Sequence, residues 1–164
     1  MSVPDLRTSD SVEATERLGA ALAPVLRAGD VLVLAGDLGA GKTRFVAGLA
    51  HGLQPGTRVR SPSFTLVNEY RGAGGAAGAA LTLYHLDLYR LRTGEVDGLG
   101  LEEYAETGAL AVEWGDRLPA AWREEALTLA FDVRADETRT ISASAERGRG
   151  LALLEAWRAL PEAP

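Results

Sequence analysis

The sequence predicts an α/β fold in which a mixed β-sheet is flanked by helices. Three observations support it: a glycine-rich segment joins a buried strand to a helix, helical and strand patterns alternate, and a hairpin pattern follows later in the chain. Helices that alternate with strands favour parallel pairing, whereas hairpins add antiparallel pairs, so the sheet should be mixed. A length of 164 residues with 46% apolar and 24% charged residues suits one domain over 1–164.

The first predicted elements surround the glycine-rich segment. Residues about 11–27 should form an amphipathic helix, because apolar residues recur at helical spacing, and Pro24 could end this helix early. Residues 31–35 are a short apolar run rich in β-branched side chains, which is typical of a buried strand. Residues 43–53 carry an apolar helical stripe. Residues 1–8 are expected to be a flexible end.

The rest of the chain alternates further strands with short helices. Residues 71–80 consist mostly of glycine and alanine, cannot fill a core, and are expected to form the mobile tip of a hairpin. A brief helix should begin near Pro119, and residues 161–164 should form a second flexible end. The other predicted elements are strands over 65–70, 81–87, 110–114, 127–133 and 138–142, short helices within 94–106, and a closing helix over 151–160.

The glycine-rich segment, residues 36–43, reads Gly-Asp-Leu-Gly-Ala-Gly-Lys-Thr and matches the pattern G-x-x-x-x-G-K-[ST]. Lys42 is the only lysine among 17 basic residues. A compact ammonium can enter a ring of backbone N–H groups and reach two phosphates, whereas a planar guanidinium is too wide. Chance matches in a chain of this composition number on the order of 0.001. The segment therefore predicts a single P-loop NTPase-like domain that binds a nucleoside triphosphate.

A nucleoside triphosphate in such a loop is bound with magnesium, to which Thr43 offers one hydroxyl ligand. Asp87 and Glu113 each end an apolar strand, which makes both candidates for the carboxylate that the metal also needs. The alternative for either residue is a solvated carboxylate at a strand end. His85 is better explained as a hydrogen-bonded sheet histidine, and His51 as a surface residue.

Composition and charge exclude several classes of function. The net charge of −6 argues against a large nucleic-acid footprint, so no contact with DNA is expected and RNA should be held by partners. The absence of cysteine excludes disulfides and thiolate metal sites. No apolar run is long enough for a membrane span and the first residues do not resemble a secretion signal, so we expect a cytoplasmic protein. A guanine-reading Asn-Lys-x-Asp motif is impossible because Lys42 is already used, which disfavours a GTPase.

Four motifs together resemble those of the TsaE (YjeE-type) family. They are the phosphate loop at 36–43, Ser-Pro-Ser-Phe-Thr-Leu-Val-Asn-Glu-Tyr at 61–70, His-Leu-Asp-Leu-Tyr-Arg-Leu at 85–91, and Val-Glu-Trp at 112–114. The resemblance implies a magnesium-dependent ATPase needed for N6-threonylcarbamoyladenosine at position 37 of tRNAs that read A-starting codons. It also implies slow ATP hydrolysis that supports multiple turnover by the TsaB and TsaD proteins, with tRNA bound only indirectly through these partners.

The resemblance further implies roles for particular residues. Ser63 stands where the family usually has threonine, and the Gly/Ala tract is longer than expected, but neither departure touches the nucleotide motifs. The implied catalytic residues are Lys42, Asp87 and Glu113; the implied magnesium ligands are Thr43, Asp87 and Glu113; the implied switch-like segment is Ser61, Pro62, Ser63 and Phe64; and the implied nucleotide-binding residues are Ser11, Thr15, Asp37, Leu38, Gly39, Ala40, Gly41, Lys42, Thr43 and Arg44.

Two other functions are compatible with the same phosphate loop. A small-molecule kinase would use Arg90, Arg92 or Arg117 as cations of an acceptor site or lid. A nucleotide-gated interaction module would bind partners in response to the nucleotide, with hydrolysis incidental. The kinase requires transfer of phosphate to a small acceptor, and the module requires partner binding that does not depend on hydrolysis.

Overall fold

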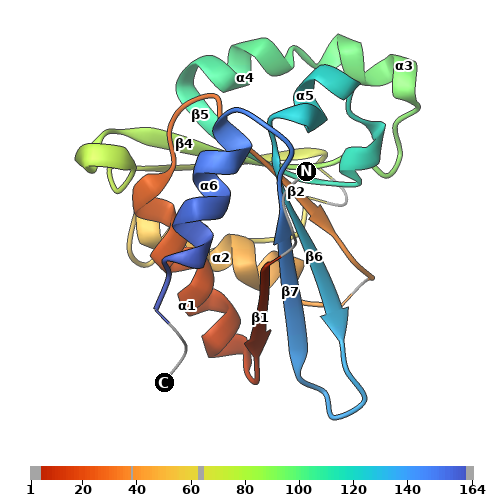
Figure 1. The fold of residues 1–164 in the computed structure, drawn as a ribbon. Helices are drawn as coiled ribbons and strands as arrows, with labels where there is room; N and C mark the ends of the chain where they lie inside the picture. The colour runs from red at the N-terminus through yellow and green to blue at the C-terminus, as the bar shows by residue number, and fades with distance from the viewer. Residues whose placement is uncertain (1–4, 38, 63–64, 162–164) are drawn as a thin grey trace.

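The computed structural model describes residues 5–37, 39–62 and 65–161 of the chain. A single sheet of seven strands has the order β1-β7-β6-β2-β5-β4-β3 (Figure 1). The four neighbouring strands β6, β2, β5 and β4 are parallel, whereas β3, β7 and β1 add antiparallel pairs at the two sides. The predicted mixed sheet is therefore confirmed. The strands are β1 (Asp5–Ser9), β2 (Val31–Ala35), β3 (Val67–Gly72), β4 (Leu81–Asp87), β5 (Gly108–Glu113), β6 (Leu127–Val133) and β7 (Arg139–Ser144).

Helices cover both faces of the sheet (Figure 1). One face packs against α1, α2 and α6 through a large apolar cluster that includes Phe45, Phe131 and Trp157. The rings of Phe45 and Phe131 lie 5.7 Å apart between centroids. The other face packs against α3, α4 and α5 through a second cluster around Leu86 and Val112. The helices are α1 (Val12–Leu22), α2 (Lys42–Leu53), α3 (Thr93–Val96), α4 (Leu101–Thr107), α5 (Ala120–Glu124) and α6 (Arg149–Arg158).

The first helix is shorter than predicted. It ends at Leu22 and continues as the 3₁₀ turn η1 (Ala23–Val25), which contains Pro24. Because proline cannot donate a backbone hydrogen bond, the α-helix ends before Pro24, as the sequence allowed. Within residues 5–37, 39–62 and 65–161, none of the helices combines the length and apolar character that crossing a bilayer requires.

Residues 5–8, expected to belong to a flexible end, instead lie in β1, which pairs antiparallel with β7 from Asp5↔Ala143 to Ser9↔Arg139. Arg7 adds a second connection, because its guanidinium donates to the carbonyl oxygens of Trp157, Arg158, Leu160 and Pro161 after and within the last turn of α6. The start of the described chain is thus bound to its end.

The Gly/Ala tract packs against the end of α2 instead of projecting as a free tip. The backbone N–H groups of Ala73 and Gly74 both donate to the Leu53 carbonyl at 3.1 Å, and Ala76 N–H donates to Leu26 O at 2.9 Å. A Cβ atom at Gly74 would lie 2.3 Å from the Gly52 carbonyl oxygen. The tract contributes little side-chain area, but glycine permits a close backbone approach that a side-chain pattern does not predict.

A buried ion pair joins α6 to the turn before β2. Asp30 is 1% exposed and accepts from Arg149 Nε at 2.7 Å and from Arg27 N at 2.8 Å, while Arg149 also donates to Val25 O at 2.6 Å. We expect Arg149→Ala to destabilise the fold by about 3–5 kcal/mol, because it leaves a buried carboxylate without its cation. Urea unfolding would measure this loss. The control Arg147→Ala removes an exposed pair with Glu124 and should cost no more than about 1 kcal/mol; equal losses would contradict the prediction.

Candidate functional site: a phosphate loop beside two strand-end carboxylates

The phosphate loop runs from the end of β2 to the start of α2. Gly36 and Gly41 have φ angles of 141° and 109°, which side-chain-bearing residues rarely adopt. A Cβ atom at Gly36 would also lie 2.5 Å from the Phe131 carbonyl oxygen, so β6 leaves no room for a side chain there. Gly41 is the N-cap of α2, and its carbonyl accepts from Phe45 N at 3.0 Å. The loop therefore delivers the chain directly into the N-terminus of a 12-residue helix, where backbone N–H groups favour an anion.

Lys42 lies across this loop. Its Nζ donates to the Gly36 carbonyl at 2.6 Å and lies 3.4 Å from Glu113 Oε1. The Lys42 side chain is 11% exposed, so its ammonium is held at the base of the loop and does not extend into solvent. The lysine thus joins the end of β2 to the end of β5, the two neighbouring parallel strands.

Each carboxylate oxygen of Glu113 contacts a different partner. Oε1 faces Lys42, and Oε2 accepts from Nε2 of the fully buried His85 at 2.8 Å. Burial alone would raise the pKa of Glu113, but the hydrogen bond and charge of His85, together with Lys42, outweigh burial and lower that pKa below its ordinary value. Glu113 is therefore an anion at neutral pH.

The lowered pKa of Glu113 makes a pH-dependent contribution to stability. This contribution is complete above the ordinary value of 4.5 and is lost as the pH falls through the lower pKa of the folded state. Glutamine has the same shape but cannot carry the charge. We expect the difference in free energy of unfolding between wild type and Glu113→Gln to shrink as the pH is lowered below 4.5. Urea unfolding at a series of pH values measures this difference. A difference that stays constant from neutral pH into this range would contradict the expectation.

Asp87 lies beside Glu113 because β4 and β5 are parallel in the register Asp87↔Glu113. Its Oδ1 accepts from Tyr89 N at 3.0 Å, which orients one carboxylate oxygen. Asp87, Glu113 and Thr43 line the same cavity. Two carboxylates and a hydroxyl are hard oxygen donors, and a magnesium ion is commonly held by such groups together with phosphate oxygens and water. The donor set fits a magnesium-bound polyphosphate.

The cavity that contains these groups has a volume of about 780 Å³, within the usual range for small-molecule sites. It brings together residues far apart in sequence, from α1 through the loop to the ends of β4 and β5. Ten of the sixteen lining residues are candidates from the sequence: Thr15, Asp37, Gly39, Gly41, Lys42, Thr43, Arg44, Ser61, Asp87 and Glu113.

Other candidates lie away from the cavity wall or outside the described residues. The Ser11 hydroxyl accepts from Ala14 N at 3.0 Å and caps α1, so this serine positions the helix that carries Thr15. Ala40 and Pro62 are buried and do not line the cavity. The candidates Leu38, Ser63 and Phe64 lie outside the described residues.

Four side chains on the cavity wall were not assigned roles from the sequence. Val12 comes from α1, and Arg139 reaches over from β7 to donate to the Gly39 carbonyl at 3.3 Å. Trp114 is 43% exposed and Tyr89 is 58% exposed, and their rings lie 4.9 Å apart between centroids. Trp114 belongs to the Val-Glu-Trp motif at 112–114, so the sequence contained a signal for its place at the site, whereas no motif contains Arg139.

The arginines of the kinase alternative occupy different positions. Arg90 lines the cavity. Arg117 instead donates to the backbone carbonyls of Leu88, Tyr89 and Leu91, and its guanidinium carbon lies 5.5 Å from the centre of the Trp114 ring. Arg92 is the residue before α3 and does not line the cavity. Arg117 therefore supports the loop after β4, and only Arg90 of the three faces the candidate site.

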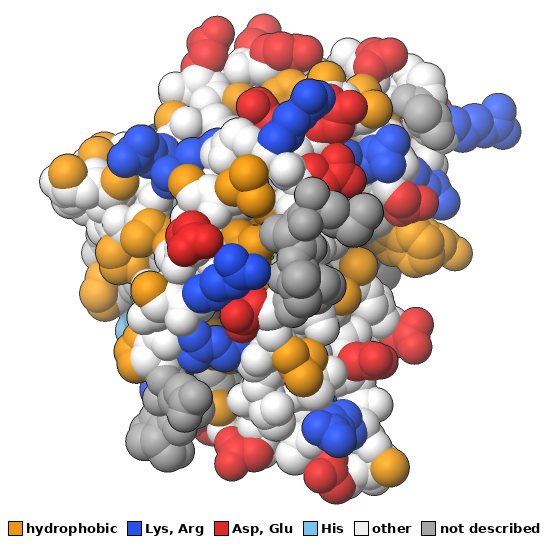
Figure 2. All heavy atoms as spheres, viewed as in Figure 1, with side chains coloured by type: hydrophobic (Ala, Val, Ile, Leu, Met, Phe, Trp, Pro, Cys, Tyr) orange, Lys and Arg blue, Asp and Glu red, His pale blue; other side chains and the backbone are white. Residues whose placement is uncertain are grey.

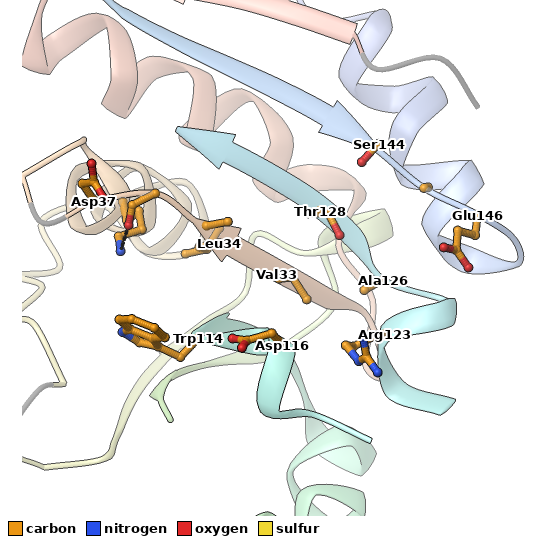
Figure 3. A pocket seen from close by; sticks show the side chains of 15 residues that line it. Val33, Leu34, Asp37, Trp114, Asp116, Arg123, Ala126, Thr128, Ser144 and Glu146 are labelled. Atoms are coloured by element: carbon orange, nitrogen blue, oxygen red, sulfur yellow. Dashed lines mark hydrogen bonds between the residues drawn. The ribbon is translucent and has the colours of Figure 1, made fainter. Parts of the chain in front are cut away.

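A second hollow of about 790 Å³ lies on the other side of the loop and shares Gly36, Asp37, Lys42 and Trp114 with the first. In Figure 3, Trp114 and Asp116 flank one side of β2, and Ser144 and Glu146 lie across it beyond β6. Neither Thr43 nor the two strand-end carboxylates line this hollow. We therefore place the candidate nucleotide site in the first cavity.

The sheet, the phosphate loop and the strand-end carboxylates define a P-loop NTPase-like protein with a mixed sheet. The family model described as "Threonylcarbamoyl adenosine biosynthesis protein TsaE" matches residues 9–141. The chain belongs to the TsaE family.

Curated relatives from several bacteria carry the description "tRNA threonylcarbamoyladenosine biosynthesis protein TsaE". The relative from Nostoc sp. is 47% identical over 112 residues, which span 65% of this chain and 65% of the relative. The chain thus spans just under two thirds of that protein. The relative from Treponema pallidum is 40% identical over 136 residues, with 82% of this chain and 96% of the relative covered. For the Bacillus subtilis relative, the identity is 38% over 84% of this chain and 83% of the relative.

A solved structure supports the same assignment of fold. The structure titled "Crystal structure of Bacillus subtilus YdiB" superposes with a TM-score of 0.76 at 34% sequence identity. The superposition covers 96% of each chain, so it includes the sheet, the loop and the flanking helices.

Proposed function

We propose that this protein is a magnesium-dependent ATPase that acts in the formation of N6-threonylcarbamoyladenosine at position 37 of tRNAs that read A-starting codons. Membership of the TsaE family supports the pathway. The observation that carries the ATPase activity is the meeting of Lys42, Thr43, Asp87 and Glu113 around one cavity at the N-terminus of α2. We further propose that residues 1–164 act as one domain in the cytoplasm.

Each of these residues has a role that follows from its chemistry. The Lys42 ammonium would exchange the Gly36 carbonyl for phosphate oxygens and offset their charge. Thr43, Asp87 and Glu113 would hold the magnesium ion, which when bound neutralises charge that develops on the phosphates. Thr15 and Arg139, which line the same cavity, would contact the rest of the nucleotide. Adenine selectivity rests on the family relationship.

The proposed partners are the TsaB and TsaD proteins, with tRNA bound through them. The charge of the protein supports an indirect contact with tRNA, since the net charge is −6. On the face shown in Figure 2, basic and acidic side chains are interspersed and do not gather into one basic area. In this proposal, slow hydrolysis by the present protein supports repeated turnover of the partner pair.

Reconstitution tests the proposal directly. Purified wild-type protein should support multiple-turnover modification of tRNA by TsaB and TsaD supplied with threonylcarbamoyl-adenylate and ATP, and Lys42→Ala should not. Equal multiple-turnover modification with both proteins would overturn the proposal. Transfer of labelled phosphate from ATP to a small acceptor, in place of release as free phosphate, would instead favour the kinase.

A further inference from the structure

His85 is a buried titratable side chain for which the proposed ATPase mechanism has so far given no role. It lies on β4 two residues before Asp87, on the sheet face that packs against α2, and it is 0% exposed. Its Nε2 is bonded to Glu113 Oε2, but its Nδ1 has no hydrogen-bond partner within the described residues. A buried polar atom without a partner is unfavourable, and an apolar side chain at this position would avoid that cost. The bond to Glu113 is the interaction that explains a histidine here.

The geometry also assigns the direction of the hydrogen bond between His85 and Glu113. An ionised carboxylate only accepts hydrogen bonds, so Nε2 must carry the proton that lies between His85 and Glu113. Nδ1, by contrast, has no hydrogen-bond partner in the described part of the chain. The ring is therefore an Nε2–H donor whose hydrogen bond is directed at Glu113.

The two partners of Glu113 differ in what a ligand can do to them. Lys42 lines the candidate nucleotide cavity and is the cation that the proposed function directs to phosphate. His85 does not line that cavity, and no part of it is exposed. When Lys42 turns to phosphate, the bond from His85 remains, and it can keep Glu113 Oε1 directed into the cavity.

We propose that His85 is a positioning residue that fixes the orientation of the Glu113 carboxylate toward the nucleotide cavity. The proposal rests on the proposed function for its kinetic consequence, but its structural part can be tested without nucleotide or metal. It assigns no catalytic role to the ring itself, which is beyond the reach of any bound ligand.

The first experiment examines the nucleotide-free protein. The chain has two histidines, so a long-range ¹⁵N–¹H spectrum at neutral pH has two imidazoles to assign, and His51→Gln removes one of them. We expect His85 to carry a proton on Nε2, and the Nε2 and proton signals to shift in Glu113→Gln. An Nε2 without a proton, or signals unchanged in Glu113→Gln, would overturn the proposal whether or not the protein hydrolyses ATP.

The second experiment separates positioning from a merely structural role. His85→Leu removes the donor, whereas His85→Gln keeps an N–H donor at about the reach of Nε2. In His85→Leu, we expect hydrolysis at saturating magnesium-ATP to slow by about 10–100-fold. ATP affinity measured in EDTA should change less than about threefold. His85→Gln should recover most of the rate. An unchanged rate in His85→Leu, or equal rates in the two variants, would overturn the proposal.

Unfolding curves for both variants establish that rates are compared between folded proteins. If His85→Leu does not fold, the spectrum and the His85→Gln variant still test the proposal. A loss of hydrolysis rate in His85→Gln that is matched by an equal loss of ATP affinity would contradict positioning. If wild type does not hydrolyse ATP, the proposed function fails, and the spectrum still decides how His85 is bonded.

Discussion

Lys42→Arg should weaken ATP binding by about 10–150-fold and abolish tRNA modification, although arginine is the cation that this chain uses at every other basic position. The Lys42 side chain is 11% exposed and lies between the Gly36 carbonyl and Glu113. A guanidinium there would have to fit a planar group into a slot that admits a single ammonium. Isothermal titration with magnesium-ATP measures the affinity, and the reconstituted modification assay measures activity.

The control for Lys42→Arg is the reverse exchange away from the candidate site. Arg58 is exposed and does not line the candidate nucleotide cavity, so Arg58→Lys should leave affinity and activity unchanged. Unchanged ATP affinity in Lys42→Arg would show that the slot accepts any cation. In that case the presence of one lysine at this position would have no steric explanation.

Gly48→Ala should destabilise the fold by about 3 kcal/mol or more, because α1 and α2 cross with their backbones in contact. A Cβ atom at Gly48 would lie 2.0 Å from the Glu16 carbonyl oxygen, and one at Gly19 would lie 2.3 Å from Phe45 O. Helix propensity alone would favour alanine by about 1 kcal/mol, so the sign of the effect distinguishes crowding from propensity. Urea unfolding measures the change.

Gly94→Ala is a matched control for the crossing. Gly94 also lies in a helix, α3, but nothing lies within 4 Å of the Cβ that alanine would add. Its stability should change by less than about 1 kcal/mol in either direction. A Gly48→Ala protein as stable as wild type would mean that the two helices can separate at little cost. Since Thr15 lies on α1 and the loop leads into α2, such a separation would also change the candidate site.

The sequence located the elements whose residues carry their own pattern. The predicted strands over 31–35, 81–87 and 127–133 coincide with β2, β4 and β6, each of which begins with a buried apolar residue. β1 was missed because Leu6 is the only apolar residue among its five and is 58% exposed. Its strand conformation comes from pairing with β7, and that contact is not encoded in the local pattern.

The candidate site also contains both residues that local sequence patterns locate and residues that only contacts between distant segments bring together. The motifs locate Lys42, Thr43, Asp87 and Glu113, because each stands at a fixed place relative to a strand or a helix. The bond between His85 and Glu113 depends on the register of β4 and β5, which the sequence alone does not give. Arg139 is harder still to predict, since it reaches Gly39 of the loop from β7, 100 residues later in the chain.

The pairing of β1 with β7 has a consequence for the order in which the protein can form during synthesis. Thr15 lies in α1, the helix that follows β1, and Arg139 begins β7, so the candidate nucleotide cavity has walls from segments next to the first strand and in the last strand of the described sheet. On the ribosome, the phosphate loop emerges long before β7 does, and β1 has no neighbouring strand to join until then. A nascent chain therefore cannot complete the cavity wall that Arg139 contributes until β7 has been translated, whereas Lys42, Thr43, Asp87 and Glu113 emerge earlier.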